Sequence, residues 1–452
     1  MGAILGRKWG GIHGSFWFLP LLQTITIAAI AVVTLRFDRN IWEFSADSRW
    51  VFGGGPEAAR TVLSVIAGSL ITVVSVAFSI TIIAVQQAAT QYSPRVLRRF
   101  LEDRTNQWVL GTYIATFISA LLVLREVRDD TPDIAGFVPA VSVTFIMVLA
   151  IVSIGMLVYF IHHIVQSIQI STMLMGIRQE FKKELNLRFS DEVDSGDSRA
   201  IGAARDTAEV DLLPGRRELR IEAQKEGYVR SIEVRQLITA TRGSGIHVVI
   251  ATRSVGDYLF PGMVMFRIHS EGELEPERTK SIRNAVLVSS SRSVRQDLLF
   301  AVRQITDIAI KALSPGINDP TSAEECITHL GGMIADLIAR RFPPARETLE
   351  SRMYVFKRPD FDDYVRASFS QIRQVARGKA HVLKTLIGTL AELALLAKSS
   401  ARLTPLRQEV EYAMSELESS GMTDFDRREL QRLCQSEIQK IRHLAEDLRK
   451  TA

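Results

Sequence analysis

Four long apolar runs in the first third of the chain constrain its fold more than any other feature. They cover residues 15–35, 61–85, 107–124 and 137–161. A helix needs about 20 mostly apolar residues to cross the hydrocarbon core of a bilayer, and each run meets that length. The sequence therefore predicts four transmembrane helices within residues 1–170 of a multi-pass membrane protein. The first run is too long for a cleaved signal peptide.

Charged residues are unevenly distributed between the two parts of the chain. They make up 23% of the 452 residues, and after residue 170 they recur every few positions. This asymmetry predicts a membrane α-helical domain, solvated by the lipid bilayer, followed by an α+β region in water. The net charge of +5 is too small to indicate a face for nucleic acid. Cys326 and Cys434 lie far apart without metal-ligand neighbours, so we expect reduced thiols, no metal and no other cofactor.

Basic residues near the ends of the spans predict the orientation. Arg7 and Lys8 precede the first span, and the loop between the second and third spans, YSPRVLRRFLEDRTN, carries Arg95, Arg98, Arg99 and Arg104. The loops after the first and third spans are richer in carboxylates. The positive-inside rule then places both termini in the cytoplasm, with the spans in the plasma membrane.

The second span carries a stripe of small and polar residues. Its members recur at steps of three, four or seven, which places them on one face of a helix: Ser64, Gly68, Thr72, Ser75, Ser79, Gln86 and Thr90. One interpretation is close helix packing, since small residues let backbones approach and hydroxyls bond between helices. The other is a pore, in which several copies turn the stripe toward a common axis. The sequence leaves both open.

Ionisable residues are absent from the apolar core of every span. Proton pumps usually carry such groups there, whereas a channel can use hydroxyls, carbonyls or charges beside the spans. After the fourth span, adjacent His162 and His163 point about 100° apart on a helix, so we interpret them as interfacial side chains rather than ligands of one metal ion. Apolar residues continue at nearly helical spacing to Leu185, which predicts one helix running from the bilayer into the cytoplasm.

The rest of the chain divides into three segments. Residues 171–218 are expected to form a helix extension and a linker, residues 219–275 a small β module, and residues 276–452 a helical domain. The spacing of Gly227, Gly256 and Gly262 makes the β module similar to the barrel-sandwich fold of biotinyl and lipoyl carrier domains. Its turn RGSG lacks the lysine that would carry a prosthetic group, so the similarity implies a packing or assembly module.

The stretch ALSPGINDPTSAEEC interrupts the helical region with turn residues. Its members Ser314, Pro315, Gly316, Asn318, Asp319 and Pro320 form what we name the hallmark turn. Ser314 precedes a proline, and Gly316 suits a positive φ after a helix. Asp319 is well placed as an N-cap with Pro320 at the first helical position. Contact of Asn318 and Asp319 with a cation or a partner's arginine is the alternative.

These blocks resemble a known family. YSPRVLRRFLEDRTNQWVLGTYIATFISALLVLR, FIHHIVQSIQ, RQDLLFAVRQITDIAIKALSPGINDPTSA and the GYV segment are similar to a bacterial family of predicted integral membrane proteins, catalogued as a domain of unknown function. The likeness covers nearly the whole chain. It implies four spans and a cytoplasmic region, makes SPGINDP a hallmark, and carries no enzymatic activity.

Three functions compete. The first is a homo-oligomeric channel or channel-like transport protein whose second span lines the axis. The second is a membrane-anchored sensor or scaffold whose cytoplasmic half binds a protein partner. The third, an enzyme, is disfavoured because the chain has no phosphate-cradling Gly-Lys loop, no HExxH and no nucleophile elbow, and we assign no catalytic residue. We therefore expect a protein without enzymatic activity, with the channel as the first choice.

Overall fold

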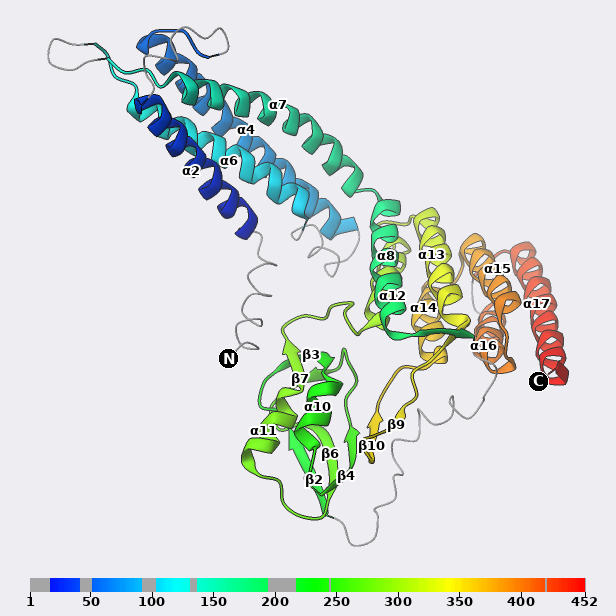
Figure 1. Cartoon of the computed structure of the whole chain (residues 1–452). Helices are drawn as coiled ribbons and strands as arrows, with labels where there is room; N and C mark the ends of the chain where they lie inside the picture. Colours follow the sequence, from blue (N-terminus) through cyan, green and yellow to red (C-terminus); the bar gives the residue numbers. More distant parts are fainter. Residues whose placement is uncertain are drawn as a thin grey trace. The chain divides into compact units, whose positions relative to one another are not determined.

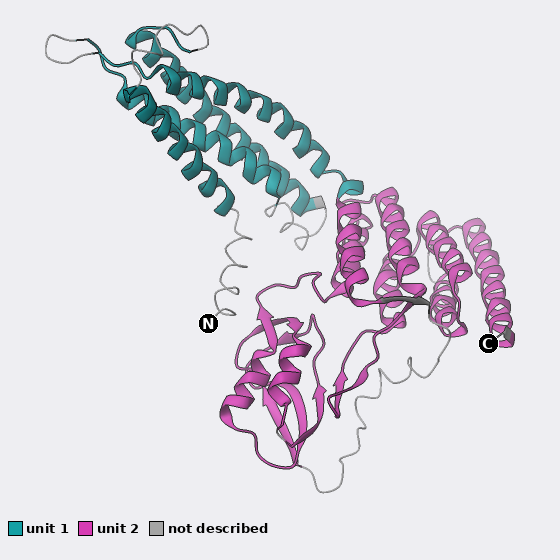
Figure 2. Ribbon diagram, in the orientation of Figure 1, with its two compact units in different colours: residues 1–172 teal, residues 173–452 magenta. Residues whose placement is uncertain are grey.

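The computed structural model describes residues 17–40, 51–91, 103–130, 136–193, 217–243, 245–418 and 421–451. Contacts divide the chain into a first unit, residues 1–172, and a second unit, residues 173–452 (Figure 2). Residues 194–216 of the expected linker and the YSPR block at residues 92–95 lie outside the described residues.

Four helices of the first unit are long and apolar enough to cross a membrane, as the sequence predicts. They are α2 (Phe18–Asn40), α4 (Pro56–Gln91), α6 (Arg104–Glu126) and α7 (Ala140–Ser167) (Figure 1). Each helix continues past the end of its apolar run. A helix satisfies its backbone hydrogen bonds internally, so it can extend through the polar boundary of a bilayer without change.

The interior of the first unit is built around α6, which packs against α2, α4 and α7. Helix α4 buries a row of small residues in this unit: Ala59, Ala67, Ala77, Ala84 and Ala88. Small side chains let helix backbones approach closely, which increases van der Waals contact where lipid provides no hydrophobic driving force. Large apolar side chains of α4 point outward instead, with Val65 and Ile83 each 63% exposed.

The helix that the sequence predicts to continue from the fourth span is interrupted. Helix α7 ends at Ser167, and α8 (Ile170–Arg188) begins after Ile168 and Gln169. No proline or glycine lies at the break, where the Ser167 hydroxyl donates to the carbonyl of His163 at 2.8 Å. Helix α8 buries one apolar face at steps of one, three or four residues: Met173, Leu174, Ile177, Phe181 and Leu185. The expected single helix is therefore two helices with a short joint.

The strands of the second unit form two larger sheets and a short pair. One sheet has the order β2-β6-β4-β10-β9 and the other the order β5-β3-β7, while β1 pairs with β8. The bounds are β1 (Ser190–Val193), β2 (Arg217–Glu222), β3 (Gly227–Ile232), β4 (Ile246–Ala251), β5 (Tyr258–Leu259), β6 (Val264–Ser270), β7 (Val286–Ser289), β8 (Arg340–Arg341), β9 (Arg346–Leu349) and β10 (Arg352–Phe356). Among the described residues no sheet closes into a barrel, so the barrel-sandwich expectation is not confirmed.

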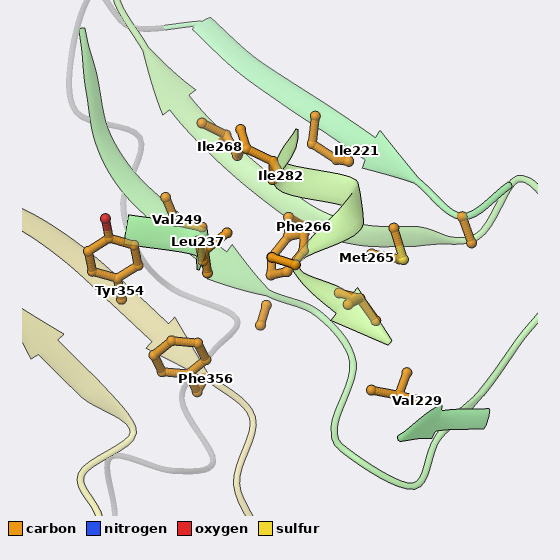
Figure 3. Packing of buried hydrophobic residues seen from close by; sticks show 14 of the residues in the cluster. Ile221, Val229, Leu237, Val249, Met265, Phe266, Ile268, Ile282, Tyr354 and Phe356 are labelled. Atoms are coloured by element: carbon orange, nitrogen blue, oxygen red, sulfur yellow. The ribbon is translucent and has the colours of Figure 1, made fainter. Parts of the chain in front are cut away.

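Two short helices pack beside these sheets, α10 (Val234–Thr241) and α11 (Pro276–Asn284). The small β module expected at residues 219–275 therefore contains a helix, because its segment VRQLITAT is α10. Its apolar residues recur at helical spacing, and Leu237 is fully buried. Leu237 joins Phe266 and Ile282 in the core (Figure 3).

The helical domain expected at residues 276–452 also contains strands, β7–β10. Strand β10 returns to the larger sheet and pairs in parallel with β4, with Met353 opposite Val248. This pairing brings Tyr354 and Phe356 into the core (Figure 3). The hydroxyl oxygens of Tyr354 and Thr241 lie 2.7 Å apart, so the buried phenol has a hydrogen-bond partner.

Helices form most of the remaining chain. They are α12 (Leu298–Ala312), α13 (Pro320–Ile338), α14 (Phe361–Val375), α15 (Ala380–Leu396), α16 (Ser400–Glu416) and α17 (Asp424–Thr451) (Figure 1). Neighbours in the chain pack together: α12 on α13, α15 on α16, and α16 on α17. Asp297, Asp319 and Asp360 cap the N-termini of α12, α13 and α14 through their side chains.

Candidate functional site

The stripe of the second span lies on the exposed face of α4. All seven side chains, those of Ser64, Gly68, Thr72, Ser75, Ser79, Gln86 and Thr90, are exposed in the single chain. A Cβ atom added at Gly68 would meet no atom within 4 Å. Successive helical residues turn by about 100°, so the stripe spans roughly 80° of α4. The buried alanine row is centred almost opposite.

Four stripe hydroxyls, those of Thr72, Ser75, Ser79 and Thr90, donate to backbone carbonyls of α4 itself. Thr72 donates to the carbonyl of Gly68, Ser75 to that of Ile71, and Ser79 to that of Ser75. Within the described residues, no stripe side chain hydrogen-bonds to another helix of the chain. The outward face of α4 thus carries small side chains, and most of its hydroxyls already donate within the helix. Such a face suits the close approach of another helix.

The polar groups inside the first unit come from α6, which the sequence reading passed over. Its buried polar residues are Asn106, Gln107, Thr112, Thr116 and Ser119. Gln23 of α2 donates to Thr112 at 3.4 Å, and the hydroxyls of Thr116 and Ser153 lie 3.5 Å apart. The run NQWVLGTYIATFIS already contained this signal, because polar residues at three-to-four steps in a span indicate a helix facing other helices.

Two carboxylates hold the ends of this helix bundle. Asp38 is 2% exposed and accepts hydrogen bonds from the backbone N–H groups of Val141 and Ser142, both at 2.9 Å. Asp103 caps α6 and lies 2.7 Å from the Nε2 of His163. His163 therefore has a structural partner, while His162 contacts Gln166. No group of three or more His, Cys, Asp or Glu side chains suited to a metal ion occurs in the part of the chain described.

The hallmark turn joins α12 to α13, and its side chains contact their own chain. Asp319 accepts from the backbone N–H of Ser322 at 3.1 Å, with Pro320 at the start of α13, as the sequence predicts. The positive φ expected at Gly316 instead occurs at Asn318, with φ 49°. Ser314 donates to the carbonyl of Lys311, one residue before Pro315 disfavours further helix. The ammonium of Lys379 donates to the side-chain amide oxygen (Oδ1) of Asn318 at 2.5 Å.

A cavity that the sequence did not reveal lies within the second unit. Its volume is about 1190 Å³. The walls come from α10, the turn before β5, the segment before α12, the residues after β10, and helices α12 and α14. No single motif contributes these walls, so only the folded chain assembles them.

Comparison with known proteins supports the membrane assignment. An uncharacterized protein of Mycobacterium tuberculosis, Rv1290c, is 29% identical to this chain over 390 residues, which cover 85% of this chain and 72% of the relative. The uncharacterized protein Mb1321c of Mycobacterium bovis matches with the same identity and coverage. No solved structure matches. A family model described as "Predicted membrane protein (DUF2254)" matches residues 13–392. The chain therefore belongs to this family of membrane proteins.

Proposed function

We propose that the protein is a multi-pass protein of the bacterial inner membrane whose copies assemble through the exposed face of α4 into a channel or channel-like transport path. The observation that carries the proposal is the position of the stripe, opposite the alanine row that α4 buries in its own chain. Helix α4 is thus two-sided, with one small-residue face occupied and another free. Small faces favour helix contact, and their hydroxyls can also border water.

Contact with lipid alone does not account for the stripe of small residues on α4. Acyl chains pack as well against leucine as against serine, so a lipid-facing surface needs no ordered stripe. The flanking side chains Val65, Ile71 and Val76 are large and apolar, as lipid contact requires. The small residues are confined between these flanks, which limits the contact to a narrow surface along α4.

Cysteine cross-linking tests the assembly. Ser75→Cys and Thr72→Cys should give disulfide-linked dimers of the full chain in native membranes, because both positions are exposed. Ala77→Cys is the matched control, since Ala77 is buried within its own chain. The native Cys326 and Cys434 are buried and should contribute little background. If the stripe variants cross-link no better than Ala77→Cys, the assembly proposal is wrong.

Ion flux in liposomes tests conduction separately. The reconstituted protein should pass ions, and Ser79→Phe should lower the flux at least tenfold while the oligomeric mass is unchanged, because a ring of bulky side chains would close a narrow path. Val65→Phe, at an exposed apolar position of the same helix, should leave the flux within about twofold. Absence of flux under varied voltage, tension and ion composition would refute the channel function without contradicting assembly through α4.

The orientation is part of the proposal. The basic residues around the first span and before the third favour cytoplasmic termini under the positive-inside rule. Epitope tags at both ends should resist protease in intact spheroplasts and become sensitive after lysis. Digestion of either tag before lysis would contradict this orientation.

A sensor or scaffold is the second candidate, favoured by the junction between α7 and α8. Only Ile168 and Gln169 separate the fourth span from a helix whose apolar face is buried. A change in the membrane could reach the second unit along this route. Affinity purification of the full chain should then recover a stoichiometric protein partner. This partner should be lost when residues 421–451 or the exposed surfaces of the second unit are altered. Recovery of the chain alone would count against the sensor or scaffold function.

A further inference from the structure

The cavity of the second unit has the size of a small-molecule site. Its volume is about 1190 Å³, somewhat above the roughly 300–1,000 Å³ typical of ligand pockets. Phe356, Tyr364 and Leu298 contribute apolar wall, and charged side chains supply much of the remainder. Because its walls come from both the strand-rich part and the helical part of this unit, a bound molecule would contact both.

The carboxylates that line the cavity already have donors. Asp297 accepts from Arg292 at 2.8 Å, and Glu347 accepts from Arg358 at 2.7 Å. The other three accept from neutral donors close in the chain: Glu233 from Ser231, Asp257 from the N–H of Ser254, and Asp363 from the N–H of Asp360. None of the five therefore requires a ligand cation to satisfy its oxygens.

Three lining cations, like Glu233 and Asp257, have no partner of opposite charge in the part of the chain that the structure describes. Arg235, Arg303 and Lys357 have no carboxylate within 4.0 Å among the described residues, and Arg303 donates to the side-chain amide oxygen of Gln371 at 2.8 Å. An unpaired guanidinium lining a cavity retains donors in a planar fork that matches phosphate and carboxylate oxygens.

The N-terminus of α10 adds donors to the same wall. Glu233, Val234 and Arg235 line the cavity, and the N-cap Glu233 makes no side-chain hydrogen bond to the helix. Its carboxylate binds Ser231 instead. By contrast, carboxylates cap α12 and α14. The first-turn N–H groups of α10 are thus available to an acceptor, and the positive end of a helix dipole favours an anion.

We propose that this cavity binds a phosphate-bearing small molecule of about nucleotide size. Arg303, Lys357 and Arg235, with the N-terminus of α10, hold the phosphate oxygens, and the apolar wall contacts the remainder of the molecule. The carboxylates limit the site to ligands whose negative charge is compact. Since the ligand contacts both parts of the second unit, its binding stabilises one arrangement of them.

Calorimetry on the full chain in detergent tests the site with four probes: inorganic phosphate, pyrophosphate, ATP and adenosine. We expect saturable binding of ATP or pyrophosphate, weaker binding of phosphate, and none of adenosine. Arg303→Gln and Lys357→Gln should each lower the affinity for the phosphorylated probe about tenfold, which is the effect expected for the loss of one charge-assisted hydrogen bond. Arg303→Lys should recover part of the affinity.

Matched controls lie outside the cavity. Arg230→Gln and Lys280→Gln remove exposed cations that do not line it, and they should leave the affinity within about twofold. Lys357 is exposed, so its variant remains informative even if Arg303→Gln folds poorly. The proposal fails if no phosphorylated probe binds, if adenosine binds as well as ATP, or if the cavity variants and the controls bind alike. Because binding is measured directly, the result is independent of conduction.

Discussion

The carboxylate of Asp38, near the end of α2, accepts hydrogen bonds from both the backbone N–H of Ser142, at 2.9 Å, and its hydroxyl, at 2.7 Å. The two residues are 104 positions apart in the chain. The N-cap of α7 is Pro139, whose side chain cannot accept a hydrogen bond. A carboxylate from another helix thus performs the capping that the local sequence of α7 does not provide.

Replacing Asp38 should therefore destabilise the first unit. Asp38→Ala leaves the N–H groups of Val141 and Ser142 without their acceptor in a buried position, which should cost about 1–3 kcal/mol. Asp129→Ala removes an exposed carboxylate paired with Arg60 and should cost under about 1 kcal/mol. Thermal unfolding of the two variants in detergent would compare them, and equal midpoints would contradict the capping role.

Gly256 and Gly262 form a matched pair for separating backbone strain from crowding. Both have positive φ, +92° and +89°. A Cβ at Gly256 would lie 2.6 Å from Asp297 Oδ2 and 2.7 Å from Arg292 Nη2, whereas at Gly262 it would meet nothing within 4 Å. Gly262→Ala should cost about 1 kcal/mol from strain, and Gly256→Ala about 3 kcal/mol, because Asp297 and Arg292 hold each other in place. Chemical unfolding of the full chain measures both losses of stability. Equal losses for the two variants would show that Asp297 and Arg292 move away from the added Cβ atom at little cost.

The buried ion pair between Glu409 and Arg373 should matter more than an exposed pair. The two side chains are 2% and 6% exposed and approach to 3.1 Å. Glu409→Gln leaves a buried guanidinium with less counter-charge and should cost about 3 kcal/mol. Glu429→Gln breaks the pair with Lys384, where the side chains are 48% and 59% exposed, and should cost under about 1 kcal/mol. Unfolding midpoints in denaturant compare the two variants. A larger loss of stability for Glu429→Gln than for Glu409→Gln would refute the greater role of the buried pair.

Arg292→Gln should make stability depend more strongly on pH. Burial raises the pKa of Asp297 above its ordinary value, and the Arg292 guanidinium opposes that rise. Without Arg292 the pKa should climb further, so the folded state prefers the protonated carboxyl. A raised carboxyl pKa gives stability that is present at low pH and lost as pH rises through the folded-state pKa. The free energy of unfolding of the variant should be lower than that of the native chain by about 3 kcal/mol at pH 8 and by less than half of that at pH 5.

Melting curves at these two pH values check this expectation. The variant Arg295→Gln, which removes an exposed arginine three residues away, serves as the control and should show the native pH dependence. A penalty for Arg292→Gln that stays constant between pH 5 and pH 8 would contradict the role of Asp297.

The spans were predictable because their cause is local. A run of about 20 apolar residues forms a helix in lipid whatever its neighbours are, and α2, α4, α6 and α7 all follow such runs. Capping is local too: Asp319 and Pro320 begin α13 where the sequence indicates. That the stripe residues share one helix face followed from helical periodicity, but their exposure and what they contact in an assembly did not.

The remainder depends on contacts between distant residues. Strand β10 pairs with a strand about a hundred residues earlier, and no local pattern around Tyr354 specifies that partner. Asp38 follows the first apolar run, where the sequence indicates a loop, although its carboxylate caps a helix far along the chain. The cavity, whose walls come from several such contacts, was invisible for the same reason.

The break between α7 and α8 sets the length of a tether. From Ser167 to Ile170 the chain takes three peptide steps, which reach about 11 Å when fully extended. A larger displacement of the last turn of α7 must pull α8 along or unwind one of the two helices. The buried side chains of α8 run from Met173 to Leu185, so unwinding this helix from either end would expose apolar surface to solvent.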